Sequence, residues 1–284
     1  MKFLIPGGAG YIGSHMVRFA QEQGHEVVVL DDFSTGHEWS IKDCEILHVN
    51  LLDEEKLWQV LKGRYFDGVI HFAAKSLVQE SCRKPDLYYR NNFIGTSNLV
   101  KVMIENNIEN LVFSSTAAIY GNPVMEKISE DHPKNPINPY GKSKLMVEKM
   151  LIDICSAYDF NTTCLRYFNA AGAHESGDIG EDHEPETHLI PNIIYAAFAD
   201  KSNLKVFGDD YSTSDGSCIR DYIHVTDLAQ AHMLSFEHMK KNTGFSAFNI
   251  GNGVGFSVFE LIKSCEEFAN KKISYEIVNR REGD

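Results

Sequence analysis

The chain has 284 residues, of which 43% are hydrophobic, and its formal net charge is −13. This length allows one large or two modest domains with a sizeable core. The acidic balance, without any run of lysine and arginine, argues against broad binding to nucleic acid or to an anionic membrane. No apolar run approaches membrane-spanning length. The six cysteines are scattered without a C-x-x-C pair, and no signal peptide is visible after Met1. We therefore expect free thiols and a cytoplasmic location.

The first 167 residues alternate short apolar runs with longer helical patterns. We expect strands at Lys2–Ile5, Glu26–Leu30, Glu45–Val49, Gly68–Phe72, Asn110–Ser114 and Thr162–Tyr167. Between them we expect helices at Tyr11–Gln23, Glu54–Lys62, Asp86–Asn107 and Pro139–Tyr158. This alternation predicts βαβ units, and hence an α/β fold with a Rossmann-type doubly wound parallel sheet.

The pattern changes after Tyr167. Gly172–Glu186 is rich in glycine and acidic residues, which is typical of a surface loop, and helical patterns return at Leu189–Ala199, Thr226–Met239 and Val258–Phe268. We expect a smaller mixed α/β domain over the carboxyl ends of the strands, the edge at which such sheets bind ligands. The predicted division is 1–167 and 222–250 for cofactor binding, and 168–221 and 251–284 for substrate binding.

A glycine-rich loop follows the first expected strand and opens the first helix. Gly8, Gly10 and Gly13 form G-x-G-x-x-G. Glycines allow a tight turn and close approach of a pyrophosphate, and the helix N-terminus offers amides to that anion. Asp31 lies 18 residues beyond Gly13, near the spacing expected of a ribose-binding acid, and favours NAD over NADP. The alternative is a glycine turn that binds no ligand.

A tyrosine and a lysine, Tyr140 and Lys144, lie four residues apart at an expected helix start. Asn138 is a suitable N-cap and Pro139 suits the first helical position. Residues at this spacing share a helix face. A neighbouring cation, helped by the helix N-terminus, favours the phenolate and lowers its pKa from ~10. The pair therefore suggests a base for an alcohol proton; the alternative is an ordinary surface pair.

With these motifs, essentially the whole chain resembles the extended short-chain dehydrogenase/reductase family. It is most similar to members that interconvert UDP-galactose and UDP-glucose through transient oxidation at sugar carbon 4. The resemblance is carried by Gly7–Gly13, Val69–Ala74, Lys84–Asn92, Phe113–Gly121, Pro139–Val147, Leu165–Gly172, Arg220–Leu228 and Arg280–Asp284. It implies an NAD cofactor, a UDP-sugar substrate and a homodimer.

The resemblance also assigns residues. It implies Tyr140 as the catalytic base, with Lys144 and Thr116 as its catalytic partners. For cofactor binding it implies Gly7, Gly10, Tyr11, Ile12, Gly13, Asp31, Asp32, Asn50, Leu51, Phe72, Ala73, Ala74, Asn91, Ser114, Tyr140, Lys144 and Phe168. For substrate binding it implies Thr116, Tyr140, Asn169, His188, Leu189, Phe207, Arg220, Arg281 and Asp284. An ion pair with Asp221 is the ordinary alternative for Arg220.

Several alternatives stay open. The dehydratases of the family carry an acidic pair where Thr116 is here followed by Ala117 and Ala118, so elimination is disfavoured. A decarboxylase, a 4-epimerase of another UDP-sugar (an N-acetylhexosamine or a uronate) and a non-catalytic NAD-binding regulator remain possible. His188 stands where many members have asparagine. Family members continue beyond Asp284, so we expect a substrate domain that is incomplete at its C-terminus.

Four residues that can bind metals lie close together in the expected surface loop: Asp182, His183, Glu186 and His188. Their spacing matches no common zinc pattern. We therefore expect no metal site.

Overall fold

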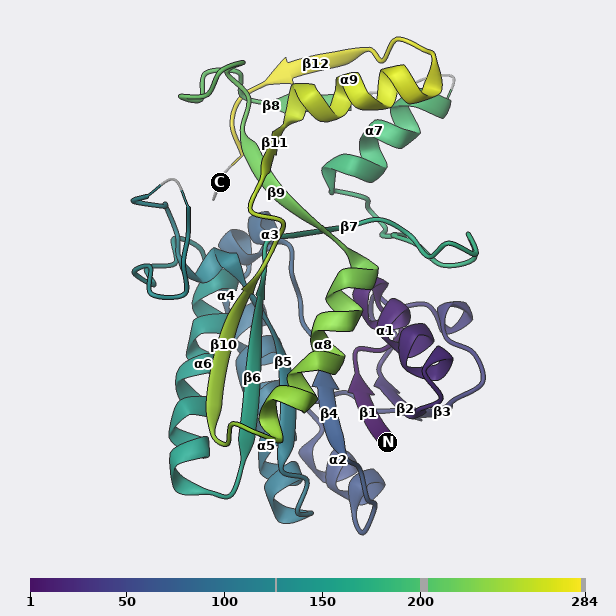
Figure 1. Ribbon diagram of the computed structural model, residues 1–284, viewed down its shortest axis with the longest axis vertical. Helices are drawn as coiled ribbons and strands as arrows, with labels where there is room; N and C mark the ends of the chain where they lie inside the picture. Colours follow the sequence, from purple (N-terminus) through teal and green to yellow (C-terminus); the bar gives the residue numbers. More distant parts are fainter. Residues whose placement is uncertain (126, 200–203, 282–284) are drawn as a thin grey trace.

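The computed structural model describes residues 1–125, 127–199 and 204–281. A parallel sheet flanked by helices forms the larger part, and a smaller region stands over one edge of that sheet (Figure 1). None of the described helices combines the length and the apolar character that crossing a membrane requires.

The main sheet has seven strands in the order β10-β6-β5-β4-β1-β2-β3, and every neighbouring pair is parallel. The strands are β1 (Lys2–Pro6), β2 (Glu26–Asp31), β3 (Glu45–His48), β4 (Gly68–His71), β5 (Asn110–Thr116), β6 (Asn161–Tyr167) and β10 (Phe245–Ile250). This order, with the first strand central and the direction of winding reversed beside it, is the Rossmann arrangement. The predicted fold class is confirmed.

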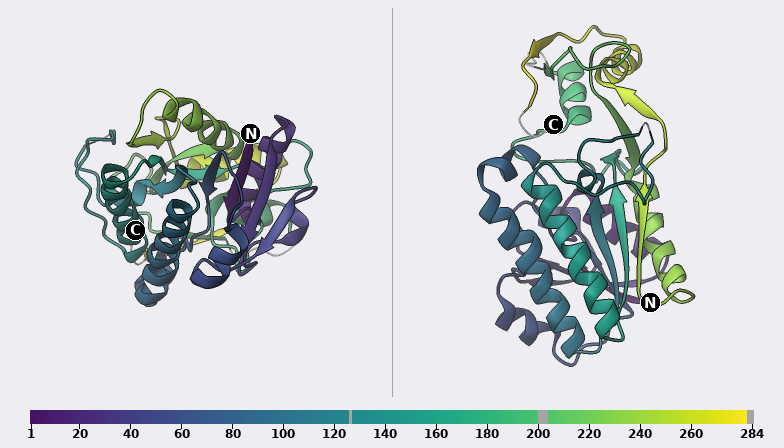
Figure 2. Two further views of the ribbon diagram at one scale, coloured as in Figure 1. Left: turned by 90° about the horizontal axis from the view of Figure 1, so that it is seen from below. Right: turned by 90° about the vertical axis from the view of Figure 1, so that its left-hand side faces the viewer.

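Helices cover both faces of the sheet. α1 (Tyr11–Glu22) and α8 (Val225–Met239) pack together on one face, while α2 (Glu54–Leu61), α5 (Gly95–Glu105) and α6 (Pro139–Ala157) cover the other (Figure 2). After Lys2, every residue of β1 is apolar and buried. Phe3 and Ile5 are buried in the core beneath α1 and α8, and Leu4 is buried in the core on the opposite face. A strand covered on both faces needs apolar residues at every position.

The helix expected over Asp86–Asn107 is interrupted. It consists of α4 (Pro85–Tyr88), a π-helix (Tyr89–Ile94) and α5, and α3 (Val78–Arg83) precedes it. Within the π-helix, buried Asn92 accepts a hydrogen bond from the Lys75 amide (2.9 Å) and donates to the Lys75 carbonyl (2.9 Å) and to Ser143 Oγ on α6 (3.1 Å). The wider turn thus ties α6 to the loop after β4, a contact between distant segments that local propensity does not indicate.

The smaller region contains two short sheets and two helices. β7 (Asn169–Ala171), β9 (Ile219–His224) and β11 (Gly255–Ser257) form one sheet, and β8 (Leu204–Phe207) pairs in parallel with β12 (Tyr275–Val278). α7 (Leu189–Phe198) and α9 (Val258–Ala269) enclose a core of their own that includes Ile193, Val206 and Ile262. The expected loop after β7 has neither helix nor strand up to α7.

Candidate active site

The glycine loop joins β1 to α1 and leaves one side open. A Cβ on Gly7, whose φ is +78°, would lie 2.3 Å from the Ala73 amide nitrogen, and one on Gly13 would lie 2.1 Å from the Gly7 carbonyl oxygen. A Cβ on Gly10 would meet, among the described residues, only the Gly7 carbonyl oxygen at 3.5 Å. Gly10 is the N-cap of α1, so the first amides of that helix lie beside this open side. The loop therefore suits a pyrophosphate.

Asp31, at the end of β2, holds the loop in place. It is 8% exposed, and its two carboxylate oxygens accept hydrogen bonds from the amides of Ala9 (3.0 Å) and Phe33 (2.9 Å). Burial raises the pKa of this carboxyl, and the bonds from Ala9 and Phe33 act against that rise. A carboxylate has about four lone-pair sites, so Asp31 can still accept a ribose hydroxyl. The sequence predicted the ribose role only; the bond to Ala9 depends on the folded loop.

The other candidate cofactor residues lie along the carboxyl ends of the strands. Asp32 accepts a hydrogen bond from the Asn50 side-chain amide at 2.5 Å, and the Asn50 amide oxygen accepts from the Leu52 amide at 2.8 Å. After β4, the amides of Phe72 and Ala73 both donate to the Pro6 carbonyl at the end of β1. Tyr11 and Ile12 begin α1, Leu51 and Ala74 lie in the loops after β3 and β4, Asn91 is in the π-helix, Ser114 is in β5, and Phe168 follows β6.

The expected catalytic residues come from α6 and β5. The Asn138 side chain caps α6 by accepting from the Gly141 amide at 2.9 Å, with proline next, as predicted. The Thr116 side chain, at the end of β5, acts on the phenol of Tyr140 and lowers its pKa. Lys144 is 2% exposed and donates to the Ser114 carbonyl at 2.7 Å. The structure thus brings the tyrosine, lysine and threonine side chains to one end of two adjoining elements.

The sequence predicted that the pKa of Tyr140 is lowered. When only the protein's own groups act on the phenol, this prediction is wrong. Burial raises the pKa of Tyr140, and Thr116 opposes the rise only in part. Burial also lowers the pKa of Lys144 from 10.5 to about 7. Desolvation disfavours both charged forms and is the largest cause of both shifts. A phenolate therefore needs an additional positive charge in this site.

A buried ion pair supports the catalytic helix. Glu148, one turn beyond Lys144, accepts two hydrogen bonds from Arg166 on β6, at 3.0 and 2.8 Å. Ser115 Oγ donates to the same carboxylate at 2.5 Å, and Arg166 also donates to the Tyr120 hydroxyl at 2.8 Å. This network fixes α6 against β5 and β6. Sequence reasoning missed it, although a charged residue inside the apolar run of β6 was an available signal.

Four expected substrate residues gather near the start of α7. The Arg281 guanidinium lies 3.9 Å from the centre of the Phe207 ring and 3.3–3.4 Å from the Thr187 carbonyl oxygen. His188 is the N-cap of α7 and Leu189 is its first residue. Residues from β8, from the segment after β12 and from the start of α7 therefore meet, and they offer a cation stacked on an aromatic ring.

The remaining expected substrate residues lie on the three-stranded sheet. Asn169 donates through its side-chain amide to the Asp221 carbonyl (2.8 Å), and Arg220 donates to the Ile219 carbonyl (3.1 Å). The Asp221 side chain accepts from the amides of Asn252 (2.8 Å) and Gly253 (2.7 Å), and so holds that turn. Asp284 lies outside the described residues.

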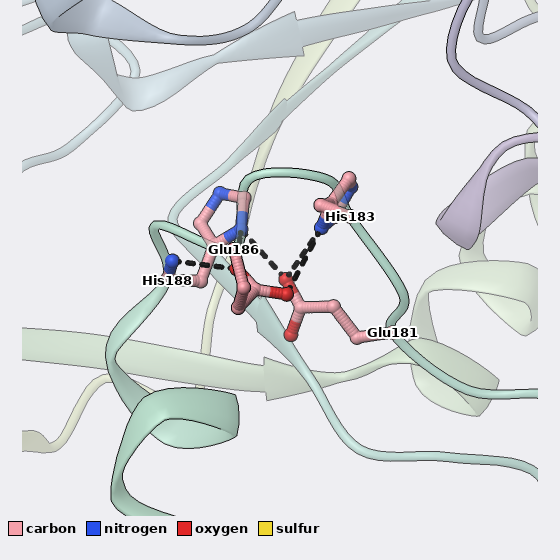
Figure 3. A group of neighbouring side chains, drawn as sticks. All are labelled: Glu181, His183, Glu186 and His188. Atoms are coloured by element: carbon pink, nitrogen blue, oxygen red, sulfur yellow. Dashed lines mark hydrogen bonds and ion pairs between the residues drawn. The ribbon is translucent and has the colours of Figure 1, made fainter. Parts of the chain in front are cut away.

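The metal-binding residue types in the loop before α7 group differently from the sequence expectation. His183, Glu186 and His188 come together with Glu181 (Figure 3). Asp182 instead lies 3.5 Å from His37. Successive residues in this extended loop point in different directions, so proximity in the sequence misidentified the fourth member.

The fold, the glycine loop and the tyrosine, lysine and threonine side chains define a dinucleotide-dependent enzyme that acts on an alcohol. The model of the NAD dependent epimerase/dehydratase family matches residues 3–251, and the chain belongs to this family.

Relatives and solved structures match over the full chain. The UDP-glucose 4-epimerase of Halalkalibacterium halodurans is 51% identical over 284 residues, which are 100% of this chain and 85% of that protein. The UDP-glucose 4-epimerase of Homo sapiens is 42% identical and also covers 100% of this chain, which spans 86% of it. The crystal structure of UDP-glucose 4-epimerase from Brucella ovis in complex with NAD has a TM-score of 0.95 at 44% identity, covering 100% of this chain and 87% of that one. The Bifidobacterium longum enzyme in complex with NAD+ and UDP has a TM-score of 0.94 at 37% identity, covering 100% and 88%.

Proposed function

We propose that this chain is an NAD-dependent isomerase that interconverts UDP-galactose and UDP-glucose at sugar carbon 4. The observation that carries the proposal is the Tyr140 phenol, on which Thr116 acts, with buried Lys144 one turn along the same helix. The full-length similarity to proteins named UDP-glucose 4-epimerase supports the same function. In addition, Thr116 is followed by two alanines, so the general acid that dehydration needs is missing at that place.

The residues at the strand ends fit NAD. The open side of Gly10 and the first amides of α1 are suited to its pyrophosphate, and the unused lone pairs of Asp31 are suited to a ribose. We propose that Asp32, Asn50, Phe72 and Ala73 continue this binding surface. When bound, NAD supplies reversible hydride acceptance at carbon 4.

Tyr140 is the proposed base. As phenolate it accepts the proton of the sugar 4-hydroxyl, and as phenol it returns the proton to the 4-ketose after that intermediate has turned over. Thr116 donates to the phenolate and orients the hydroxyl. Because burial raises the pKa of Tyr140, the phenolate depends on positive charge from Lys144 and the oxidised nicotinamide. We therefore expect turnover to rise with pH until Tyr140 is ionised.

The nucleotide must be held firmly while the sugar turns over. We propose that Arg281, stacked on Phe207, binds the pyrophosphate together with Arg220 and Asn169. A planar guanidinium suits bidentate contact with phosphate. His188, Leu189 and Asp284 are the proposed sugar and uridine contacts.

We propose that residues 1–167 and 222–250 bind the cofactor, and that residues 168–221 and 251–284 bind the substrate. We also propose a cytoplasmic homodimer. The six cysteines, which are all free thiols, support the cytoplasmic location.

A coupled assay tests the function. Purified protein is offered UDP-galactose, UDP-N-acetylgalactosamine and UDP-glucuronate, and formation of each 4-epimer is followed. We expect conversion of UDP-galactose, at least about 100-fold slower in Tyr140→Phe. Tyr158→Phe, the same change at the exposed far end of α6, is the control and should convert it normally. Conversion of only another sugar would contradict the named substrate, and equal rates for wild type and Tyr140→Phe would contradict the mechanism.

A further inference from the structure

Two histidines and two glutamates converge in the loop between β7 and α7 (Figure 3). The Nδ1 atom of His188 lies 2.8 Å from a Glu181 carboxylate oxygen and 3.2 Å from one of Glu186. The Nδ1 atom of His183 lies 3.6 Å from Glu181 and 3.4 Å from Glu186. One donor atom from each residue can be chosen so that all four lie within 4.8 Å of one another. None of the four residues belongs to the proton-transfer site around Tyr140.

The nitrogen–oxygen separations are close to those between ligands around a small cation. Zinc binds imidazole nitrogen and carboxylate oxygen at about 2.0–2.2 Å. Ligands at the corners of a regular tetrahedron are then about 3.3–3.6 Å apart by simple geometry. The four nitrogen–oxygen distances, 2.8 to 3.6 Å, scatter around and below that edge, and the two that involve Glu186 run to its two different oxygens. Separations within the set of four donor atoms extend to at most 4.8 Å, so the side chains must close by up to about 1 Å to reach that edge.

The arrangement is also held and charged as a cation site requires. One oxygen of Glu186 accepts from the amides of Thr187 and His188, both at 2.7 Å, which leaves its other oxygen toward His183. Such supporting bonds orient a ligand before the metal arrives. Both glutamate side chains are 9% exposed, and among the described residues their ion-pair partners are these two histidines. Two carboxylates with two neutral imidazoles carry two negative charges, which one divalent cation balances.

We propose that Glu181, His183, Glu186 and His188 bind a divalent transition-metal ion of the Zn²⁺ class. Four protein ligands make a closed site, so the ion is structural rather than catalytic. It links the loop to α7, because His188 is the N-cap of that helix. It also lies near the glycine loop, since the His183 and Tyr11 ring centres are 6.2 Å apart. The ion thus stabilises the junction between the two proposed binding regions.

Metal binding by the intact protein tests this directly and needs no substrate. Chelator-treated protein is titrated with Zn²⁺ in a calorimeter against a competing chelator, and Co²⁺ is used as a spectroscopic probe. We expect one Zn²⁺ per chain and the intense visible spectrum of four-coordinate Co²⁺. His183→Ala should weaken binding by at least about 100-fold, because the loss of a mere supporting residue already costs 10–100-fold. Zn²⁺ should raise the melting temperature of the wild type but not of this variant.

Two further variants keep the test sharp. Glu181→Gln preserves shape and should show the same loss if His183→Ala folds poorly. His174→Ala removes a histidine of the same loop that pairs with Glu22 instead, and should bind Zn²⁺ like the wild type. The proposal is overturned if the wild type takes up no stoichiometric Zn²⁺, or if the two cluster variants bind as it does. A six-coordinate Co²⁺ spectrum, or thiolate bands from the free cysteines, would also overturn it. None of these readouts depends on epimerase activity.

Discussion

Replacing Lys144 with methionine should stabilise the protein while removing its activity. The ammonium is 2% exposed, donates to the Ser114 carbonyl at 2.7 Å and lies 4.7 Å from the centre of the Phe113 ring. Burial lowers its pKa from 10.5 to about 7, so folding works against the charged form. Methionine keeps an unbranched apolar side chain without the charge.

The magnitude follows from the pKa difference. The shift from 10.5 to about 7 is about 3.5 units, and at 1.36 kcal/mol per unit it costs about 5 kcal/mol when both states are protonated. Loss of the bond to the Ser114 carbonyl opposes this by about 1–3 kcal/mol. The free energy of unfolding of Lys144→Met should therefore exceed that of the wild type by about 2–4 kcal/mol near and below pH 7.

The extra stability of Lys144→Met over the wild type should decrease as the pH rises. Below the folded pKa of about 7 both states carry the proton, and the full cost is present. Between that pH and 10.5 only the unfolded chain carries it, so the wild type gains about 1.4 kcal/mol per pH unit. Above 10.5 the charge costs nothing, and the missing bond to Ser114 makes the variant the less stable protein.

Urea unfolding of cofactor-free protein from about pH 6 to 10 measures the difference in unfolding free energy and its dependence on pH. Lys142→Met, an exposed change two residues away on the same helix, is the control and should show no such pH dependence. Turnover of Lys144→Met should fall by about 10²–10⁴. A difference in unfolding free energy that does not change with pH, or a variant less stable than the wild type at pH 7, would refute the argument.

Three further changes test other parts of the site. Thr116→Val should lower kcat by about 10- to 100-fold with little change in KM, and Thr116→Ser should restore it; a normal kcat for the valine variant in steady-state kinetics would contradict the role of the hydroxyl. Glu148→Gln leaves the Arg166 charge without its carboxylate and should lower the free energy of unfolding by about 3–5 kcal/mol, which urea unfolding would show; an unchanged midpoint would contradict this. Gly13→Ala places a Cβ 2.1 Å from the Gly7 carbonyl oxygen and should abolish NAD binding by calorimetry, whereas unchanged affinity would mean that the loop can shift freely.

Six of the seven strands of the main sheet were predicted, and β10 was missed. The central strands were predictable because they are buried on both faces, whereas β10 is only partly buried. The apolar runs of β1, β2 and β4 differ from the predicted strands by a single residue at one end. The short strands of the smaller region were not predicted. β7 and β11 have three residues each, and both pair with β9, which is distant from each of them in the chain. Such strands form because a partner is present, which no local pattern reveals.

The same contrast applies to the site. Tyr140 and Lys144 are one helical turn apart, so their spacing alone gives their shared position. Their ionisation could not be obtained that way, because burial arises from the tertiary structure and dominates both pKa values. The Glu148–Arg166 pair likewise joins two elements, α6 and β6, whose approach depends on the fold.

Burial raises the pKa of Tyr140 and lowers that of Lys144, so Tyr140 should act as a base only when a further positive charge is nearby. With the groups of the protein by themselves, burial shifts both side chains toward their neutral forms, so proton transfer from an alcohol is disfavoured. One added positive charge nearby favours the phenolate, since an opposite charge within a few ångströms acts against desolvation. The oxidised nicotinamide carries that charge and the reduced form does not. Tyr140 should therefore be the stronger base when hydride can be accepted and the stronger acid after hydride has been taken up. This is the order of proton transfers that a reversible oxidation at carbon 4 requires.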